Sequence, residues 1–251
     1  MTLLEARGLS VEFGGVVALD NVDLELEAGT LTGLIGPNGA GKTTFIDAVT
    51  GMVQSSGRVL LDGGDISRDA THQRVEKGLV RTFQTLELFE DLTVEQNLSA
   101  AAERTGWWQF ISDAVRPRKS TSANAAVDRS LELVGLSNER RRLPADLSHG
   151  QRRLVGLARA LAAGPILLLL DEPAAGLDSN ESLILGQQIR AIAETGVTVL
   201  LVDHDMSLVL DVCEVITVLD FGKIIARGSP QQIQDDPAVV AAYLGKVAQQ
   251  P

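Results

Sequence analysis

The stretch LTGLIGPNGAGKTTF, residues 31–45, decides the fold of this chain. Its first five residues predict a short buried strand, and the residues from Lys42 onward predict a helix. Between them, GPNGAGKTT (36–44) fits the pattern G-x-x-x-x-G-K-[S/T]. Glycines in such a loop let backbone N–H groups wrap around phosphates, and the lysine reaches the outer phosphate groups. The order strand, loop, helix indicates a phosphate-binding site rather than an ordinary glycine-rich turn.

Strands and helices alternate on both sides of this stretch. Period-2 patterns predict half-buried strands, and short apolar runs predict buried strands of a parallel sheet. The half-buried strands are LSVEF (9–13), VDLEL (22–26) and RVLLD (58–62); the buried ones are LTGLI (31–35), ILLLL (166–170), VTVLLV (197–202) and VITVL (215–219), with LVRTF (79–83) as a further short strand. Helical spacing falls at about 42–50, 150–163, 179–195 and 206–213. This alternation predicts an α/β fold.

The middle of the chain has a different pattern. From about Thr93 to Ala163 the spacing is helical, with TVEQNLSAAAER (93–104) and ANAAVDRSLELVGL (123–136) as helices and no convincing strand. The glycine-rich loop resembles that of P-loop NTPases, and this resemblance implies a core with a mixed sheet, in which the N-terminal strands are antiparallel and the central strands parallel. The expected organisation is one domain, 1–251, whose α/β core (1–84 and 161–251) carries an inserted α-helical subdomain (85–160).

The composition of the chain limits the classes of function and the cellular locations to consider. The net charge of −11 would repel a nucleic-acid backbone, so we expect no nucleic-acid partner. The single cysteine, Cys213, excludes an internal disulfide and is expected to be a small buried hydrophobic residue. The N-terminus lacks the apolar segment of a signal peptide, and no apolar run approaches the ~18–20 residues of a membrane span. We expect a cytoplasmic protein that needs a partner to hold it at a membrane.

Two carboxylates follow the strand of leucines in ILLLLDEP (166–173). Adjacent like charges are costly, and a nearby cation relieves the cost. Asp171 fits a Mg²⁺ partner, and Glu172 fits a group that polarises a water molecule. His204 in DHDM and Gln84 in RTFQ also follow predicted strands, where side chains face the ligand crevice of a parallel sheet. A histidine there can contact a phosphate or a water, and a glutamine can contact a metal or a water.

A second helix start also fits an anion. Ser148, in LSHGQRR (147–153), precedes a helical run and is a good N-cap. A helix start offers free N–H groups to an anion. One chain would therefore carry two anion-binding helix starts.

The order of these segments resembles that of ATP-binding cassette (ABC) ATPases over nearly the whole chain. GPNGAGKTT resembles Walker A, Gln84 the Q-loop, LSHGQ the signature motif, ILLLLDEP Walker B, AAGLD (174–178) the D-loop and His204 the switch histidine. The resemblance implies catalytic roles for Glu172, His204 and Gln84, binding of Mg²⁺ by Thr43, Gln84 and Asp171, and binding of ATP by Phe13, Gly36, Pro37, Asn38, Gly39, Ala40, Gly41, Lys42, Thr43 and Thr44. It also implies that Ser148, Gly150, Gln151 and Asp178 serve the nucleotide of a second cassette, which would explain the second helix start.

A narrower resemblance is to the ATPases of branched-chain (hydrophobic) amino acid importers. It is carried by RTFQTLELFEDLTVEQNL, LLLLDEPAAGLD, VDHDMSLV and AAYLG. It implies an ATP-driven motor subunit on the inner face of the cell membrane, paired with a second ABC ATPase that is either the same chain or a sister. Transmembrane permease subunits and, indirectly, a substrate-binding protein would be its further partners.

Some interpretations stay open. A related amide or urea importer has similar segments, and a soluble cassette ATPase acting on DNA or ribosomes, or an interaction protein with an inactive nucleotide site, belongs to another class. His149 replaces the usual glycine of the signature, and AAGLD replaces the usual SALD. The aromatic residues Trp107, Trp108 and Phe110 fit either a docking surface or the core of the helical subdomain.

Overall fold

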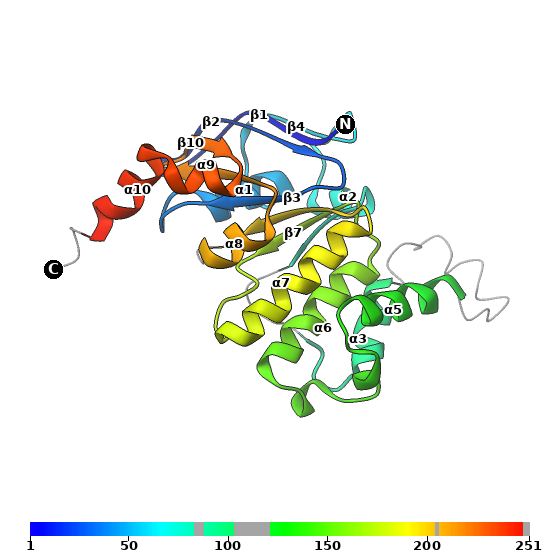
Figure 1. The fold of residues 1–251 in the computed structure, drawn as a ribbon. Coiled ribbons are helices and arrows are strands. Elements are labelled where there is room, and N and C mark those ends of the chain that lie inside the picture. The colour runs from blue at the N-terminus through cyan, green and yellow to red at the C-terminus, as the bar shows by residue number, and fades with distance from the viewer. Residues whose placement is uncertain (83–87, 103–120, 204–205, 248–251) are drawn as a thin grey trace.

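The strands form two sheets in the computed structural model, which describes residues 1–82, 88–102, 121–203 and 206–247 (Figure 1). The first sheet is antiparallel and has the order β2-β1-β4-β5, made of β1 (Thr2–Phe13), β2 (Val16–Glu27), β4 (Ser56–Leu61) and β5 (Gly64–Asp65). The second has the order β10-β9-β3-β8-β7-β6, made of β3 (Leu31–Ile35), β6 (Leu79–Thr82), β7 (Leu167–Asp171), β8 (Thr198–Val202), β9 (Val215–Asp220) and β10 (Lys223–Gly228).

In this second sheet the strands from β9 to β6 are parallel, and β10 pairs antiparallel with β9. The predicted α/β class, with antiparallel N-terminal strands and parallel central strands, is confirmed. The antiparallel strands form a sheet of their own.

Helices cover the parallel sheet and connect its strands. They are α1 (Lys42–Thr50), α2 (Thr71–Glu76), α3 (Val94–Ala102), α5 (Thr121–Leu133), α6 (His149–Ala162), α7 (Ser179–Glu194), α8 (Met206–Val212), α9 (Pro230–Asp235) and α10 (Pro237–Val247), with short 3₁₀ turns at Ser137–Glu139 and Pro144–Asp146. Among the described residues, none of these helices combines the length and apolar character needed to cross a membrane.

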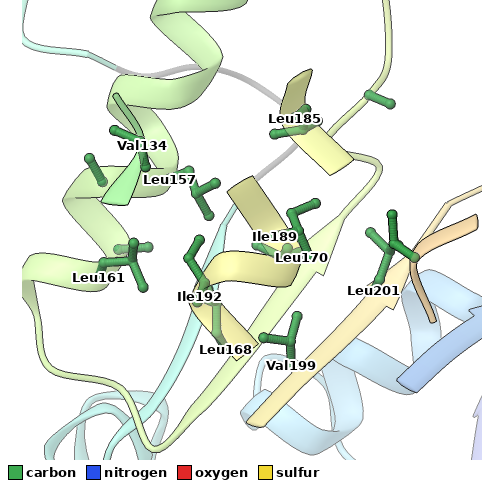
Figure 2. Packing of buried hydrophobic residues seen from close by; sticks show 14 of the residues in the cluster. Val134, Leu157, Leu161, Leu168, Leu170, Leu185, Ile189, Ile192, Val199 and Leu201 are labelled. Atoms are coloured by element: carbon green, nitrogen blue, oxygen red, sulfur yellow. The ribbon is translucent and has the colours of Figure 1, made fainter. Parts of the chain in front are cut away.

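Every residue of β3, β7 and β8 is buried, so the side chains that point to either face of the sheet are covered. On one face, the side chains of β7 and β8 meet those of α7, which recur at helical spacing (Figure 2): Leu168, Leu170, Val199 and Leu201 against Leu185, Ile189 and Ile192. On the opposite face, Leu167 and Leu169 belong to a cluster with Phe45 of α1 and with the antiparallel sheet. Helix α1 therefore lies between the two sheets, and its N-terminus is held at the edge of the parallel sheet.

Between β6 and β7, the regular elements of the described residues are α-helices and short 3₁₀ turns, and none is a strand. Helices α3, α5 and α6 pack on one another, and Val134 beside α5 lies near Leu157 and Leu161 of α6 (Figure 2). The helices predicted at 93–104, 123–136 and 150–163 are confirmed over residues 94–102, 123–133 and 150–162. Trp107, Trp108 and Phe110 lie outside the described residues.

The first two strands are longer than predicted. Strand β1 begins at Thr2 rather than Leu9, and β2 begins at Val16 rather than Val22. Several register shifts interrupt their pairing, and Gly8 within β1 has a φ of 60°. Such bulges break the strict alternation on which the sequence prediction depended.

Arg74 of α2 fixes the far end of α1. Its side chain is only 4% exposed and donates hydrogen bonds to four backbone carbonyl groups, those of Ala48, Val49, Ser67 and Asp69. Two of these groups lie in the last turn of α1, where carbonyl groups have no partner within the helix and a cation is favourable. The helix that begins at the glycine-rich loop is therefore anchored at both ends.

Cys213 is 5% exposed and packs in the core, as predicted. Burial raises the pKa of its thiol to about 12, so the thiol stays protonated at neutral pH.

Candidate functional site

The glycine-rich loop joins β3 to α1 at the carboxyl end of the parallel sheet. Gly36 and Gly41 have φ values of 155° and 107°, which residues other than glycine rarely adopt. A Cβ atom on Gly36 would lie 2.0 Å from the carbonyl oxygen of Leu219, and one on Gly41 would lie 2.6 Å from that of Ala18. Both positions therefore require glycine, because neighbouring backbone occupies the space of a side chain.

A hairpin braces this loop from the side. The N–H of Ala40 donates to the carbonyl of Pro37 (3.0 Å), and the N–H of Gly222, between β9 and β10, donates to the carbonyl of Ala40 (2.9 Å). Asn38 and Gly39 are exposed at the tip. The loop is thus fixed at its base and open at its tip, which suits backbone recognition of a phosphate group.

Lys42 lies at the first position of α1 and is buried, with 6% of its surface exposed. Its Nζ atom donates to the carbonyl oxygen of Gly36 (2.7 Å) and to that of Pro37 (3.3 Å). The ammonium group therefore lies over the loop that precedes it. Thr43, the next residue, is exposed, and Thr44 is half-buried.

The carboxylate pair follows β7. Asp171 is the last residue of this strand and is buried, while Glu172 is half-buried. Glu172 has a φ of 47°, and its N–H donates to the carbonyl of Val202 at the end of β8 (2.7 Å). A left-handed conformation is uncommon for a residue other than glycine, and such conformations gather at functional sites.

The loop and the carboxylates lie at the same edge of the sheet. Strand β8 separates β3 from β7, and the three strands are parallel, so their carboxyl ends meet. Arg81 of β6 joins the two parts directly. It donates to Asp171 Oδ2 at 2.7 Å and also forms an ion pair with Asp47 of α1. Arg81 was not predicted from the sequence, although a charged residue within a short apolar strand is a signal for a paired buried group.

Ser148 caps α6, as the sequence predicts. Its Oγ accepts from the N–H of Gln151 (3.2 Å), and the Gln151 side chain accepts from the N–H of Ser148 (3.0 Å), which forms a capping box. The buried residues of α6 belong to the cluster that covers one face of the sheet, and α1 lies on the other. The two predicted anion-binding helix starts are therefore on opposite faces of the parallel sheet.

Glu181 of α7 ties the segment AAGLD (174–178) to the start of α6. Asp178 caps α7 by accepting from the N–H groups of Asn180 (2.9 Å) and Glu181 (2.8 Å). In return, one oxygen of Glu181 accepts from the N–H of Asp178 (3.3 Å), and the other accepts from the N–H of Gly150 (3.2 Å). A capping box is visible in the sequence as D-x-x-E, but its contact with Gly150 is tertiary and was missed.

A small cavity of about 110 Å³ opens between these two helix starts, lined in part by Ser148, Gln151 and Glu181. His149 is exposed, and its Nε2 lies near Gly176, 3.6 Å from where a Cβ would be. The substituted signature residue therefore lies close to the D-loop segment of its own chain.

Two further side chains hold this segment. Arg153 donates to the carbonyl of Ala175 (2.9 Å), and the fully buried Asp203 accepts from the N–H of Ala174 (3.3 Å). Burial lowers the pKa of Arg153, and the negative charge of Asp203 opposes this shift. Arg153 is nonetheless a cation at any ordinary pH, because arginine titrates far above neutrality.

The remaining predicted residues are Phe13, Gln84 and His204. Phe13, at the end of β1, is 50% exposed and available for stacking. Gln84 and His204 lie outside the described residues.

The protein oxygens present suit a magnesium ion. Asp171 supplies a carboxylate and Thr43 a hydroxyl group, which are the hard oxygen ligands that Mg²⁺ takes in proteins. Within the described ranges, no group of three or more His, Cys, Asp or Glu side chains forms a metal site. The pair fits an ion that is also held by phosphate oxygens.

Comparison with known proteins identifies the family. Residues 19–175 match the ABC transporter family. The chain belongs to the ABC transporter ATPases. Residues 223–249 also match the family described as branched-chain amino acid ATP-binding cassette transporter. ATP hydrolysis is the activity of these cassettes, so the predicted ATPase class is confirmed.

Individual relatives align along nearly the whole chain. The branched-chain amino acid transport ATP-binding protein BraF of Pseudomonas aeruginosa is 39% identical, covering 97% of this chain and 98% of BraF. Its counterpart LivG of Escherichia coli is 38% identical, with 97% and 98% covered. A crystal structure of an ATP-binding cassette of an ABC transporter in its ADP conformation is 31% identical and superposes with a TM-score of 0.86, covering 98% and 99% of the two chains.

Proposed function

We propose that this ABC ATPase is the ATP-hydrolysing subunit of an importer for branched-chain amino acids. The observation that carries the substrate class is the match of residues 223–249, which form β10, α9 and α10, to the branched-chain family. The near full-length similarity to BraF and LivG supports the same class. An importer of amides or urea is the alternative that the sequence leaves open.

The glycine-rich loop is proposed to bind the phosphates of ATP. Backbone N–H groups of 36–44 would surround the phosphates, and the Lys42 ammonium would exchange carbonyl contacts for phosphate oxygens. Phe13 would stack on the adenine. Thr43 and Asp171, with Gln84, would hold Mg²⁺, which when bound neutralises charge on the phosphates.

Glu172 is proposed as the catalytic base. Its carboxylate would accept a proton from a water molecule as the water oxygen attacks the γ-phosphorus. The bond between that phosphorus and the bridging oxygen of ADP breaks, which releases ADP and inorganic phosphate. His204 would orient the water or contact the γ-phosphate.

The second helix start is proposed to act on a partner's nucleotide. ABC ATPases work as dimers with transmembrane permeases. Ser148, Gly150, Gln151 and Asp178 would complete the site of the paired cassette, which accounts for their position on the opposite face of the sheet from α1.

The remaining proposals concern organisation. We propose that 85–160 is a helical subdomain inserted in the core of 1–84 and 161–251. Permease subunits would hold the ATPase on the cytoplasmic face of the cell membrane, and a substrate-binding protein would deliver the cargo to them.

A reconstituted transporter tests the substrate class. The chain would be co-expressed with its permease subunits and binding protein, and the complex placed in vesicles. We expect ATP-dependent uptake of labelled leucine that excess isoleucine or valine inhibits and excess urea does not. Uptake of urea or a short amide, with no uptake of leucine, would replace the proposed substrate with the alternative one.

A further inference from the structure

Arg81 lies on the face of the sheet that meets α1. Strand β6 pairs in parallel with β7, with Arg81 opposite Leu169. Because side chains alternate along a strand, Arg81 shares a face with Leu169 and Asp171. This is the face whose apolar residues, Leu167 and Leu169, pack in the cluster that contains α1. The Arg81 side chain is only 8% exposed.

The two carboxylates that bind Arg81 come from the two halves of the nucleotide site. Asp47 belongs to α1, the helix that carries Lys42 and Thr43, and Asp171 ends β7. Their side chains are 26% and 7% exposed. The three groups together carry one net negative charge. One guanidinium therefore joins a carboxylate from each half of the site.

We propose that Arg81 is a positioning residue that sets how strongly Asp171 attracts the Mg²⁺ bound with the nucleotide. The proposal rests on the proposed metal role of Asp171. The Arg81 guanidinium donates a hydrogen bond to Oδ2 of Asp171 (2.7 Å). Oδ1 is therefore the oxygen that this contact leaves for another ligand. The positive charge of Arg81 offsets the negative charge that a divalent cation would meet. Through its second ion pair, with Asp47, Arg81 also holds α1 at a fixed position relative to β7 while the metal binds.

Removing the arginine should strengthen metal binding. A unit charge and a divalent ion several ångströms apart, at an effective dielectric near 20, interact by enough to change an equilibrium at least about tenfold. In Arg81→Gln, Asp171 loses the cation that competes with the metal for its oxygens. We therefore expect the ratio of ADP dissociation constants, without Mg²⁺ to with Mg²⁺, to rise about tenfold or more over the parent.

Titration calorimetry with ADP measures this ratio without any turnover. Each protein is titrated once in EDTA and once in excess Mg²⁺. Arg81→Lys is the matched control, because lysine keeps the charge, and its ratio should stay near that of the parent. The double variant Arg81→Gln/Asp47→Asn removes one of the two carboxylates that Arg81 stabilises. It should show the same rise as Arg81→Gln, and it serves as the test if the single variant does not fold.

The outcomes separate this inference from the proposed function. If the parent does not bind ADP, or binds it equally with and without Mg²⁺, the proposed nucleotide site is wrong. If the parent depends on Mg²⁺ and the ratio is unchanged or lower in the folded variants without Arg81, then Arg81 only stabilises the fold and the inference is overturned. An equal rise in Arg81→Lys would also overturn it, because the charge would then play no part.

Discussion

Replacing Lys42 with alanine should lower the affinity for ATP by about 100-fold or more. Charge-assisted hydrogen bonds contribute about 1.5–3 kcal/mol each, and about 2.7 kcal/mol corresponds to 100-fold in affinity. The Lys42 ammonium is already over the loop, where it donates to the carbonyls of Gly36 and Pro37. A cation in this position needs little reorganisation to reach a phosphate, so its loss removes an interaction that no neighbouring residue is placed to replace within 36–44. Calorimetry with ATP and Mg²⁺ measures the change.

Lys223→Ala is the matched control for this prediction. The Lys223 side chain, at the start of β10, is 64% exposed and pairs with Asp20 of β2, so its removal changes the net charge of the chain by the same amount as Lys42→Ala. We expect parental ATP affinity for this variant. Thermal unfolding of both variants checks that the loop region still folds. ATP affinity near that of the parent in a folded Lys42→Ala protein would show that the loop is an ordinary turn.

Replacing Glu172 with glutamine is expected to reduce ATP turnover by about 10²–10⁴-fold while nucleotide affinity stays close to that of the parent. Glutamine has nearly the same shape as glutamate but cannot accept a proton from water. The backbone contact that positions residue 172, from its N–H to the carbonyl of Val202, does not involve the side chain and is retained. Phosphate release and ATP binding, measured on the same preparation, separate the two effects.

Glu194→Gln provides the comparison. Glu194 is exposed at the last position of α7, and its change to glutamine removes one negative charge far along the chain from Glu172. Its turnover should equal that of the parent. If Glu172→Gln hydrolysed ATP at a similar rate, the base would have to be another group, with His204 the first to examine.

Much of this site could be predicted from the sequence, because its parts are local. Strand β3, the glycine-rich loop and α1 follow one another without interruption, and each is encoded by its own residues. The N-cap of α6 is local in the same sense, since Ser148 and Gln151 satisfy each other's backbone N–H groups. For this reason β7 and α6 begin within one residue of their predicted positions.

The contacts that join these parts could not be predicted in the same way. Arg81 and Asp171 are 90 residues apart, and Gly150 and Glu181 are 31 apart. Nothing in the local pattern of either partner specifies the other. The bulged first strands were underestimated for a related reason, since pairing with a neighbour, rather than alternation, defines their length.

The C-terminal elements show a further limit. Strand β10 was missed because its residues are only partly buried, which leaves a weak pattern. It pairs antiparallel with β9 and is the edge strand of an otherwise parallel sheet. The two short helices that follow it, α9 and α10, complete the segment that matches the branched-chain family.

We propose that each ATP is shared between the phosphate loop of one chain and the signature helix of another. Mixing two defective chains tests it most directly, with both carrying Glu172→Gln so that closed dimers persist. One chain adds Lys42→Ala, which damages its loop, and the other adds Ser148→Arg, which damages its signature. Ser137→Arg, at an exposed serine, is the control for an added arginine.

Size-exclusion chromatography with light scattering measures dimerisation of the chains in the presence of ATP. The Glu172→Gln chain alone should dimerise, and each doubly altered chain alone should not. In the mixture, the intact loop of one chain meets the intact signature of the other, so we predict that dimers return. If both motifs served only their own chain, no dimer would contain a whole site. Absence of dimers in the mixture, beside normal dimers of Glu172→Gln and of its Ser137→Arg control, would contradict the shared site.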